Sequence, residues 1–363
     1  MRLKLKPIKE QVVVVFGASS GIGRQAALDF ARKGARVVVA ARSKEGLTSL
    51  VEEIHQIKQD TQNGSEALMV VAEAADFESV KSVADAAVEK YGRLDTWVHA
   101  AAVMLFAKFE GTTPEEFRHV IEVNLLGQVH GAMAALPYLR ERGGALIHIS
   151  SVEAWRAVPF QSAYGASKHG TKGFLQALRV ELAHDKIPVS VTEIEPGAIN
   201  TPIYDKALNK LTYKLRPVPP VYQPEIVSEA ILYAAENPVR NLIAGAAGVG
   251  VVLSERLSPR LTDWITETVG FKGQNSGIVK PENDPDAFSA PHEPYNTIRG
   301  KYDSESLNFD PYTFLATRPA ARNAILAIAG ALVGGLAARS FINACVDKKE
   351  NKKVKNARLS KLS

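Results

Sequence analysis

The sequence predicts an α/β fold built around a seven-stranded parallel sheet. Between residue 11 and about residue 250, short runs rich in β-branched residues alternate with longer segments of helical period, and this alternation is typical of strand–helix–strand units. The first two runs, QVVVVFG and ARVVVAAR, contain four and three consecutive valines. Strands this apolar are buried on both faces, as in a doubly wound sheet that helices cover on both sides.

Seven segments fit the pattern of a buried strand, the last of them more weakly than the others. In chain order they span residues 11–17, 35–42, 67–73, 94–100, 144–150, 188–197 and 241–252. Residues 24–33 and 162–184 have helical period and lie between strands. Loop 204–223 follows the sixth strand, and we expect it to cover a ligand site.

Composition excludes several classes of protein. The chain has 363 residues, of which 46% are hydrophobic and 23% charged, as in soluble globular proteins. Its single cysteine, Cys345, allows no intramolecular disulfide, and the start, MRLKLKPIKEQ, lacks the apolar region of a secretory signal. The net charge of +5 resides in residues 347–363, with seven Lys or Arg against two acids. Such a tail is more often solvated or bound to a membrane surface, so we expect no nucleic-acid partner.

A glycine-rich loop, GASSGIG, follows the first strand and opens the helical segment 24–33. Glycines let the backbone approach a pyrophosphate, and the free amides and dipole of a helix start attract negative charge. An ordinary turn is the alternative, but the buried strand before the loop and the helix after it meet the context test for nucleotide binding. We expect the loop to bind a dinucleotide through Gly17, Ser19, Ser20, Gly21, Ile22 and Gly23.

A phenol and an ammonium stand four residues apart in the stretch YGASK. On a helix over 162–184, Tyr164 and Lys168 project from one face. A free tyrosine titrates near pH ~10, and a nearby cation stabilises the phenolate and lowers its pKa. An isolated pair of this kind is more often a surface helix pair, but Ser151 lies at the end of the fifth predicted strand. Open parallel sheets bind ligands at that edge.

These motifs together resemble the short-chain dehydrogenase/reductase family over residues 11 to about 250. The resemblance is carried by the spacing G-x-x-x-G-x-G, by Asn124 in EVNLLG, by Ser151 and YGASK, and by EPGAINTP after the sixth strand. It implies a Rossmann-like fold and hydride transfer between a nicotinamide cofactor and a carbonyl or secondary alcohol.

The resemblance also implies a role for each site residue. Tyr164 would be the general acid/base, and Lys168 would lower its pKa and hold the nicotinamide ribose. Ser151 would orient the carbonyl, and Asn124 would support a proton-relay water. The loop on the nicotinamide side would contain Pro196, Gly197, Ile199 and Thr201.

Two stretches depart from the family pattern. Phe16 stands where Thr usually precedes the first glycine, and His99, Ala100, Ala101 and Ala102 replace the usual Asn-Asn-Ala-Gly. These positions support the cofactor site, Ala100 included, but carry no proton, so we expect His99 to be a packed residue. The family's adenine-side acid falls on Glu73. The other histidines lack metal-ligand spacing, and no metal site is expected.

The end of the second strand predicts which nicotinamide cofactor binds. NAD selection in such folds uses an acid at this position, whereas NADP needs a cation for its extra phosphate. Here Ala41 occupies the acidic position and Arg42 follows, a planar donor suited to phosphate. Ser20 argues the other way, because many NADP-preferring relatives have a basic residue there. We expect NADP(H) to be preferred, with NAD(H) as the alternative.

The leading hypothesis is an enzyme that interconverts a carbonyl and a secondary alcohol on a hydrophobic substrate at or near a membrane. A catalytically weak, membrane-anchored nucleotide-binding protein and a strictly NAD-linked alcohol dehydrogenase are the alternatives. The resemblance also suggests a homodimer or homotetramer formed through helix 162–184. Small residues would allow close packing there, unless they pack inside their own subunit: Ala163, Gly165, Ala166, Gly170 and Gly173.

Four regions are expected along the chain: the NADP-binding catalytic domain, 1–270; an irregular connector, 271–318; a hydrophobic helix, 319–346; and the basic tail, 347–363.

The run AILAIAGALVGGLAA, 324–338, has no polar side chain, but its fifteen residues are fewer than the ~20 that span a bilayer. Gly330 and Gly334 have the spacing of a helix-pairing motif. We expect a membrane anchor with the catalytic domain facing the cytoplasm, the alternatives being a shallow insertion and a packed helix in a soluble cytoplasmic protein.

Overall fold

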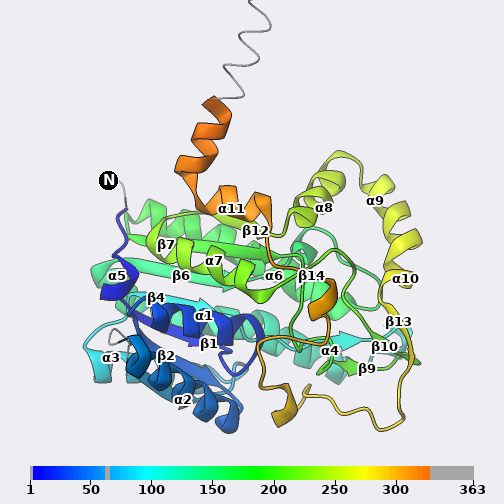
Figure 1. Ribbon diagram of the computed structural model, residues 1–363, viewed down its shortest axis with the longest axis horizontal. Helices are drawn as coiled ribbons and strands as arrows, with labels where there is room; N and C mark the ends of the chain where they lie inside the picture. The colour runs from blue at the N-terminus through cyan, green and yellow to red at the C-terminus, as the bar shows by residue number, and fades with distance from the viewer. Residues whose placement is uncertain (1–2, 62–65, 328–363) are drawn as a thin grey trace, which may run out of the picture. The chain divides into compact units, whose positions relative to one another are not determined.

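The computed structural model describes residues 3–61 and 66–327 of the chain (Figure 1). Seven parallel strands form one sheet in the order β12-β7-β6-β4-β1-β2-β3. This confirms the predicted fold class. The strands are β1 (Val12–Phe16), β2 (Arg36–Ala41), β3 (Ala67–Val71), β4 (Thr96–His99), β6 (Gly144–Ile149), β7 (Val189–Pro196) and β12 (Asn241–Ala244).

The strand order creates a switch point between β1 and β4. From β1 the chain moves through β2 to the edge strand β3, then returns to β4 on the other side of β1 and continues outward through β6 and β7 to β12. The connections on either side of this point lie on opposite faces of the sheet. Ligands in open α/β sheets bind beyond the carboxyl ends of the strands at such a point.

Helices cover both faces of the sheet (Figure 1). The helices on one face are α1 (Gly21–Arg32), α2 (Lys44–Thr61) and α7 (Pro224–Glu236). Those on the other are α3 (Phe77–Tyr91), α4 (Pro114–Ile121), the π-helical turn η3 (Glu122–Leu126), α5 (Gly127–Arg142) and α6 (Ser162–His184). The valines of β1 and β2 are fully buried between these layers, as their continuous apolar runs predict.

The seventh predicted strand is too long. Only Asn241–Ala244 is extended, and Gly245 then adopts φ 103°, a backbone conformation that favours glycine. The residues after it form helix α8, so the strand prediction for 245–252 is wrong. The helical segments that follow are α8 (Ala246–Leu257), α9 (Pro259–Ile265), the π-helical turn η5 (Thr266–Gly270) and α10 (Phe271–Gly273).

The described residues up to Thr313 form one compact unit, whereas the sequence predicts a boundary near residue 270. Segment 271–313 pairs with distant parts of the chain, because β13 (Asn275–Val279) lies antiparallel to β10 (Tyr213–Leu215), and β14 (Ser306–Leu307) lies parallel to β11 (Val221–Tyr222). The remaining short elements of this unit are η1 (Ile8–Glu10), β5 (Leu105–Phe106), η2 (Phe109–Gly111), η4 (Val152–Ala154), β8 (Ala198–Ile199), β9 (Leu208–Asn209), η6 (Glu293–Tyr295) and η7 (Asp303–Glu305).

The second compact unit begins at Phe314, within α11 (Pro311–Thr317). Its described residues 319–327 are helical. The predicted hydrophobic helix, 319–346, extends beyond the described residues, and the basic tail lies wholly outside them. Within the part of the chain that the structure describes, no helix has the length and apolar character needed to cross a bilayer.

Candidate active site

Two cavities lie side by side at the carboxyl ends of the central strands. The first, about 140 Å³, is lined by the glycine loop and the ends of β2 and β3. The second, about 300 Å³, is lined by the ends of β6 and β7 and by α6. The cavities meet at a set of shared lining residues, Ile22, Ala100, Ala102, Met104, Thr201 and Ile203.

The glycine loop packs so closely that side chains are excluded at two positions. A Cβ on Gly17, whose φ is 88°, would lie 2.4 Å from the amide nitrogen of Ala101, and a Cβ on Gly23 would lie 2.2 Å from the carbonyl oxygen of Gly17. This packing brings the start of α1 directly against the first cavity, as pyrophosphate binding requires. The predicted dinucleotide residues on this side all line that cavity: Gly17, Ser19, Ser20, Gly21, Ile22, Gly23, Arg42, Glu73 and Ala100.

The loop after β7 forms the wall where the two cavities meet. Its start is held by β8, which pairs with β11 through Ala198 and Ile199. Thr201 lines both cavities, and its side chain would be 3.3 Å from a Cβ placed on Gly21. The predicted nicotinamide-side residues all line the second cavity: Pro196, Gly197, Ile199 and Thr201.

Tyr164, Lys168 and Ser151 are brought together in the second cavity. Helix α6 has the predicted bounds and places Tyr164 and Lys168 on one face. The Lys168 ammonium lies 5.3 Å from the centre of the Tyr164 ring and donates to the carbonyl of Ile149, 2.9 Å away. Ser151 follows β6, and its hydroxyl accepts from the amide of Glu153 at 3.1 Å.

The pKa values at this site are dominated by burial. Burial and the charge of Glu153 raise the pKa of Tyr164, while a hydrogen bond with Ser151 lowers it by a smaller amount. Burial also lowers the pKa of Lys168 to about 8, against the opposing effect of Glu193 and Glu153. The resemblance implies a lowered tyrosine pKa, but here the cost of desolvating a phenolate outweighs other effects. Burial therefore favours the phenol form of Tyr164 over the phenolate.

Asn124 lies in the π-helical turn η3, and such turns are frequent at functional sites. Its carboxamide makes two hydrogen bonds to the backbone of Val103, accepting from the amide and donating to the carbonyl, both at 2.8 Å. Val103 lines the first cavity, whereas Asn124 is fully buried and lines neither. Asn124 therefore positions the segment after β4. The water-relay role implied by the resemblance stays a prediction.

Two of the residues that depart from the family pattern, Phe16 and His99, pack against each other. Phe16 and His99 are register partners on β1 and β4, and their rings stack with centroids 4.9 Å apart. Both are buried. Burial, with the nearby His148, lowers the pKa of His99 well below its usual value. His99 is therefore a neutral, packed residue, as predicted.

Glu153 is a site residue that the sequence analysis missed. It lines the second cavity and is only 9% exposed. Among the described residues, no hydrogen-bond partner meets its Oε2 atom. Burial raises the pKa of this carboxyl to about 8. The available signal was an acid two positions after Ser151, but acids in loops are usually exposed.

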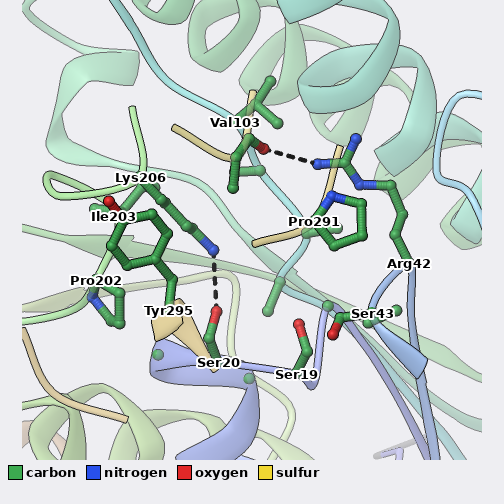
Figure 2. A pocket seen from close by; sticks show the side chains of 18 of the residues that line it. Ser19, Ser20, Arg42, Ser43, Val103, Pro202, Ile203, Lys206, Pro291 and Tyr295 are labelled. Carbon is green, nitrogen blue, oxygen red and sulfur yellow. Dashed lines mark hydrogen bonds between the residues drawn. The ribbon is translucent and has the colours of Figure 1, made fainter. Parts of the chain in front are cut away.

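Segment 287–296 is a second missed part of the site. It contributes Ala287, Pro291, His292, Tyr295 and Asn296 to the wall of the first cavity. The Asn296 amide donates to the hydroxyl of Ser43 at 3.0 Å, and the Gly21 amide donates to the carbonyl of Thr297 at 2.8 Å. Figure 2 shows Lys206 and Arg42 entering this cavity from opposite sides, with the Lys206 ammonium 3.0 Å from the Ser20 hydroxyl. The sequence analysis also missed Lys206 as a residue of this cavity.

Residues 11–211 match the model of the family described as short chain dehydrogenase. The chain belongs to the short-chain dehydrogenase family. A relative from Bacillus subtilis (strain 168), "Uncharacterized oxidoreductase YxnA", is 38% identical over 287 residues, which cover 78% of each chain. "11-beta-hydroxysteroid dehydrogenase A" of Sesamum indicum is 31% identical over 261 residues, which cover 70% of each chain.

One solved structure is similar as well. It is an alcohol dehydrogenase from the archaeon Thermococcus sibiricus, complexed with 5-hydroxy-NADP, with a TM-score of 0.56 and 27% identity. The match covers 64% of this chain and 95% of that chain. As a short-chain dehydrogenase with this site, the protein is an NAD(P)-dependent oxidoreductase.

Proposed function

We propose that this short-chain dehydrogenase transfers hydride between NADP(H) and a carbonyl or secondary alcohol on a hydrophobic substrate. The observation that carries the proposal is the meeting of the two cavities, with the glycine loop on one side and Ser151, Tyr164 and Lys168 on the other. The cofactor, when bound, supplies or accepts the hydride. Tyr164 donates the proton to the carbonyl oxygen, and Ser151 orients that oxygen.

The preference for NADP(H) is argued from the end of β2. Ala41 offers no carboxylate to the ribose hydroxyls, and the Arg42 guanidinium enters the first cavity (Figure 2). Arg42 donates to the carbonyls of Ala287 and Ser289 at 3.1 and 3.2 Å, and its Nε lies 3.6 Å from Glu73. A phosphate is a stronger acceptor than these neutral carbonyls, so it can compete for the guanidinium.

A hydrophobic substrate is argued from the second cavity. Loop 204–223 contributes Tyr204, Val218, Pro219 and Pro220 to its lining. Apolar residues of η4 and of the helical segments after β12 line it as well, including Val152, Val251, Ile265 and Val269. Apolar surface of this extent favours a substrate with substantial hydrocarbon around its carbonyl.

The proposal is tested by incubating the full chain with NADPH or NADH and a panel of aldehydes and ketones. We expect NADPH oxidation with a higher kcat/KM than for NADH. Arg42→Asp should reduce the affinity for NADPH far more than for NADH, because it replaces a phosphate-binding cation with an acid. Equal losses for the two cofactors would refute the NADP(H) preference. Binding without turnover of any carbonyl would favour the catalytically weak binding protein.

We also propose that the protein is a homodimer or homotetramer. Large apolar side chains are exposed along η3, α5 and α6, namely Leu126, Met133 and Val180. Of the small residues on α6, Gly165 and Gly170 pack against Ala157 and Leu125 of their own subunit, whereas Gly173 meets open space. Light scattering of a chain ending near residue 318 should give a dimer or tetramer, and Val180→Lys should weaken it. A monodisperse monomer would refute the proposal.

A membrane anchor at 319–346 remains a proposal from the sequence. The full chain should stay with membranes after a high-salt wash and need detergent for release, because apolar insertion does not depend on salt. A chain ending near residue 318 should be soluble and active. Release of the full chain by salt alone would mean that the basic tail binds electrostatically and that no anchor exists.

A further inference from the structure

Two cations face the first cavity from positions far apart in the sequence. Arg42 directly follows β2, and Lys206 lies in the loop after β7, between β8 and β9. The Lys206 ammonium donates to the Ser20 hydroxyl in the glycine loop at 3.0 Å (Figure 2). A lysine therefore reaches the one loop position that lacks the basic residue found in many NADP-preferring members of the family.

The two cations differ in how far they are already engaged. The Arg42 guanidinium donates to the carbonyls of Ala287 and Ser289 and makes a longer contact with that of Phe288, at 3.5 Å. It also lies beside Glu73. The Lys206 ammonium has three N–H donors, and across residues 3–61 and 66–327 only the Ser20 hydroxyl is seen to accept from it. No carboxylate of those residues lies within ion-pair distance of its nitrogen. Of the two cations, Lys206 therefore has more N–H donors available for a ligand.

The environment of Lys206 favours a bound anion. Burial and the charge of Arg42 lower the pKa of this lysine to about 8, so it is largely charged at neutral pH. A partly buried cation beside a second cation has lost hydration and gained repulsion, and an anion between the two offsets both effects.

The backbone holds the two cations in a defined relation. The Ala287 amide donates to the Lys206 carbonyl at 2.9 Å, and the Ala287 carbonyl accepts from Arg42 at 3.1 Å. The Lys206 amide in turn donates to the carbonyl of Pro202 at 2.9 Å. Ala287 thus links Arg42, directly after β2, to the loop that carries Lys206.

We propose that Lys206 binds the 2′-phosphate of NADP(H) and supplies, from the loop after β7, the positive charge that the glycine loop lacks at Ser20. The inference rests on the proposed NADP(H) preference. It makes Lys206 a residue that determines cofactor specificity and explains how Ser20 is compatible with that preference.

The test compares dissociation constants of NADPH and NADH for four full-length proteins, measured by nucleotide fluorescence. Lys206→Met should weaken NADPH binding about tenfold to a hundredfold, the scale of a hydrogen bond to a charged group, and NADH binding less than threefold. The matched control is Lys210→Met, because Lys210 is a nearby lysine that pairs with Glu116. It should change neither constant. The double variant Ser20→Lys/Lys206→Met should regain most of the NADPH affinity, because it returns a cation to the loop.

The outcomes separate this inference from the function on which it rests. Unchanged NADPH affinity in Lys206→Met would overturn the role of Lys206. Equal losses for NADPH and NADH would also overturn it, because they would place the lysine at a phosphate common to both cofactors. In either case a selective loss in Arg42→Asp would leave the NADP(H) preference intact. If Lys206→Met fails to fold, Lys206→Gln and the Ser20→Lys/Lys206→Gln pair provide the same comparison.

Discussion

The Lys168 ammonium lies 5.3 Å from the centre of the Tyr164 ring, with its hydrogen bond directed to the carbonyl of Ile149. The charge thus faces the ring while the nitrogen is anchored on the end of β6. This relation keeps a cation beside the phenol although burial raises the pKa of Tyr164 and lowers that of Lys168. Both shifts favour the uncharged form of each group, the phenol of Tyr164 and the amine of Lys168.

Tyr164→Phe removes the proton donor while keeping the ring that packs in the second cavity. Turnover should fall by a factor of roughly a hundred or more, the scale of positioned acid/base catalysis, and NADPH binding should be retained. Steady-state rates and fluorescence titration measure the two effects separately. Near-normal turnover would remove Tyr164 from the mechanism.

Lys168→Met removes both the cation beside the phenol and the group expected to hold the nicotinamide ribose. The rate and the affinity for NADPH should therefore fall together, by roughly tenfold or more for the loss of a charged hydrogen bond. Initial rates at varied NADPH concentration, with direct titration, measure both. An unchanged Michaelis constant for NADPH would contradict the ribose role.

Glu153→Gln should change how stability depends on pH. The folded protein holds the Glu153 proton up to a pKa of about 8, whereas the unfolded chain releases it near the ordinary value of 4.5. Between these values the folded state binds more protons, so the free energy of unfolding falls as pH rises. The neutral amide lacks this dependence.

The measurement is the Tm of wild type and Glu153→Gln at pH 5 and pH 8. The Tm of Glu153→Gln minus the Tm of wild type should be several degrees larger at pH 8 than at pH 5. The scale follows because 1 kcal/mol shifts Tm by roughly 2–4 °C in a domain of about this size. The same Tm difference at both pH values would show that Glu153 titrates normally.

Gly23→Ala should destabilise the glycine loop. The added Cβ would meet the Gly17 carbonyl oxygen at 2.2 Å and its carbon at 2.9 Å, and neither backbone atom can move without shifting the loop. We expect a loss of about 1 to 3 kcal/mol or more in the free energy of unfolding, together with weaker NADPH binding. The matched control is Gly111→Ala, where nothing lies within 4 Å, and denaturant unfolding compares the two. Equal stability would refute the close packing.

The sheet and the candidate catalytic side chains were predictable because their signals are local. Consecutive valines identify buried strands such as β1, and the four-residue spacing of Tyr164 and Lys168 requires only a helix. The error after Gly245 has a local cause too, because Ala-Gly-Val sequences suit a buried strand or a helix, and the left-handed turn at Gly245 is not visible in composition.

The parts that escaped prediction depend on single long-range contacts. Segment 271–313 is rich in Pro, Asn and Asp, which predicts irregular backbone but not where that backbone packs. Its place at the first cavity depends on individual hydrogen bonds such as Gly21 to Thr297 and Asn296 to Ser43. Similarly, the burial of Glu153 and the reach of Lys206 to Ser20 come from tertiary packing.

The position of segment 287–296 in the wall of the first cavity also affects when, during translation, the cofactor can bind. A ribosome delivers the glycine loop among the first residues, but the cavity wall that faces it is synthesised only some hundreds of residues later. A nascent chain that has the strands, the helices and even Tyr164 still lacks part of the dinucleotide site. Cofactor capture should therefore mark a late moment in biosynthesis, when nearly all of the compact unit 1–313 has left the ribosome.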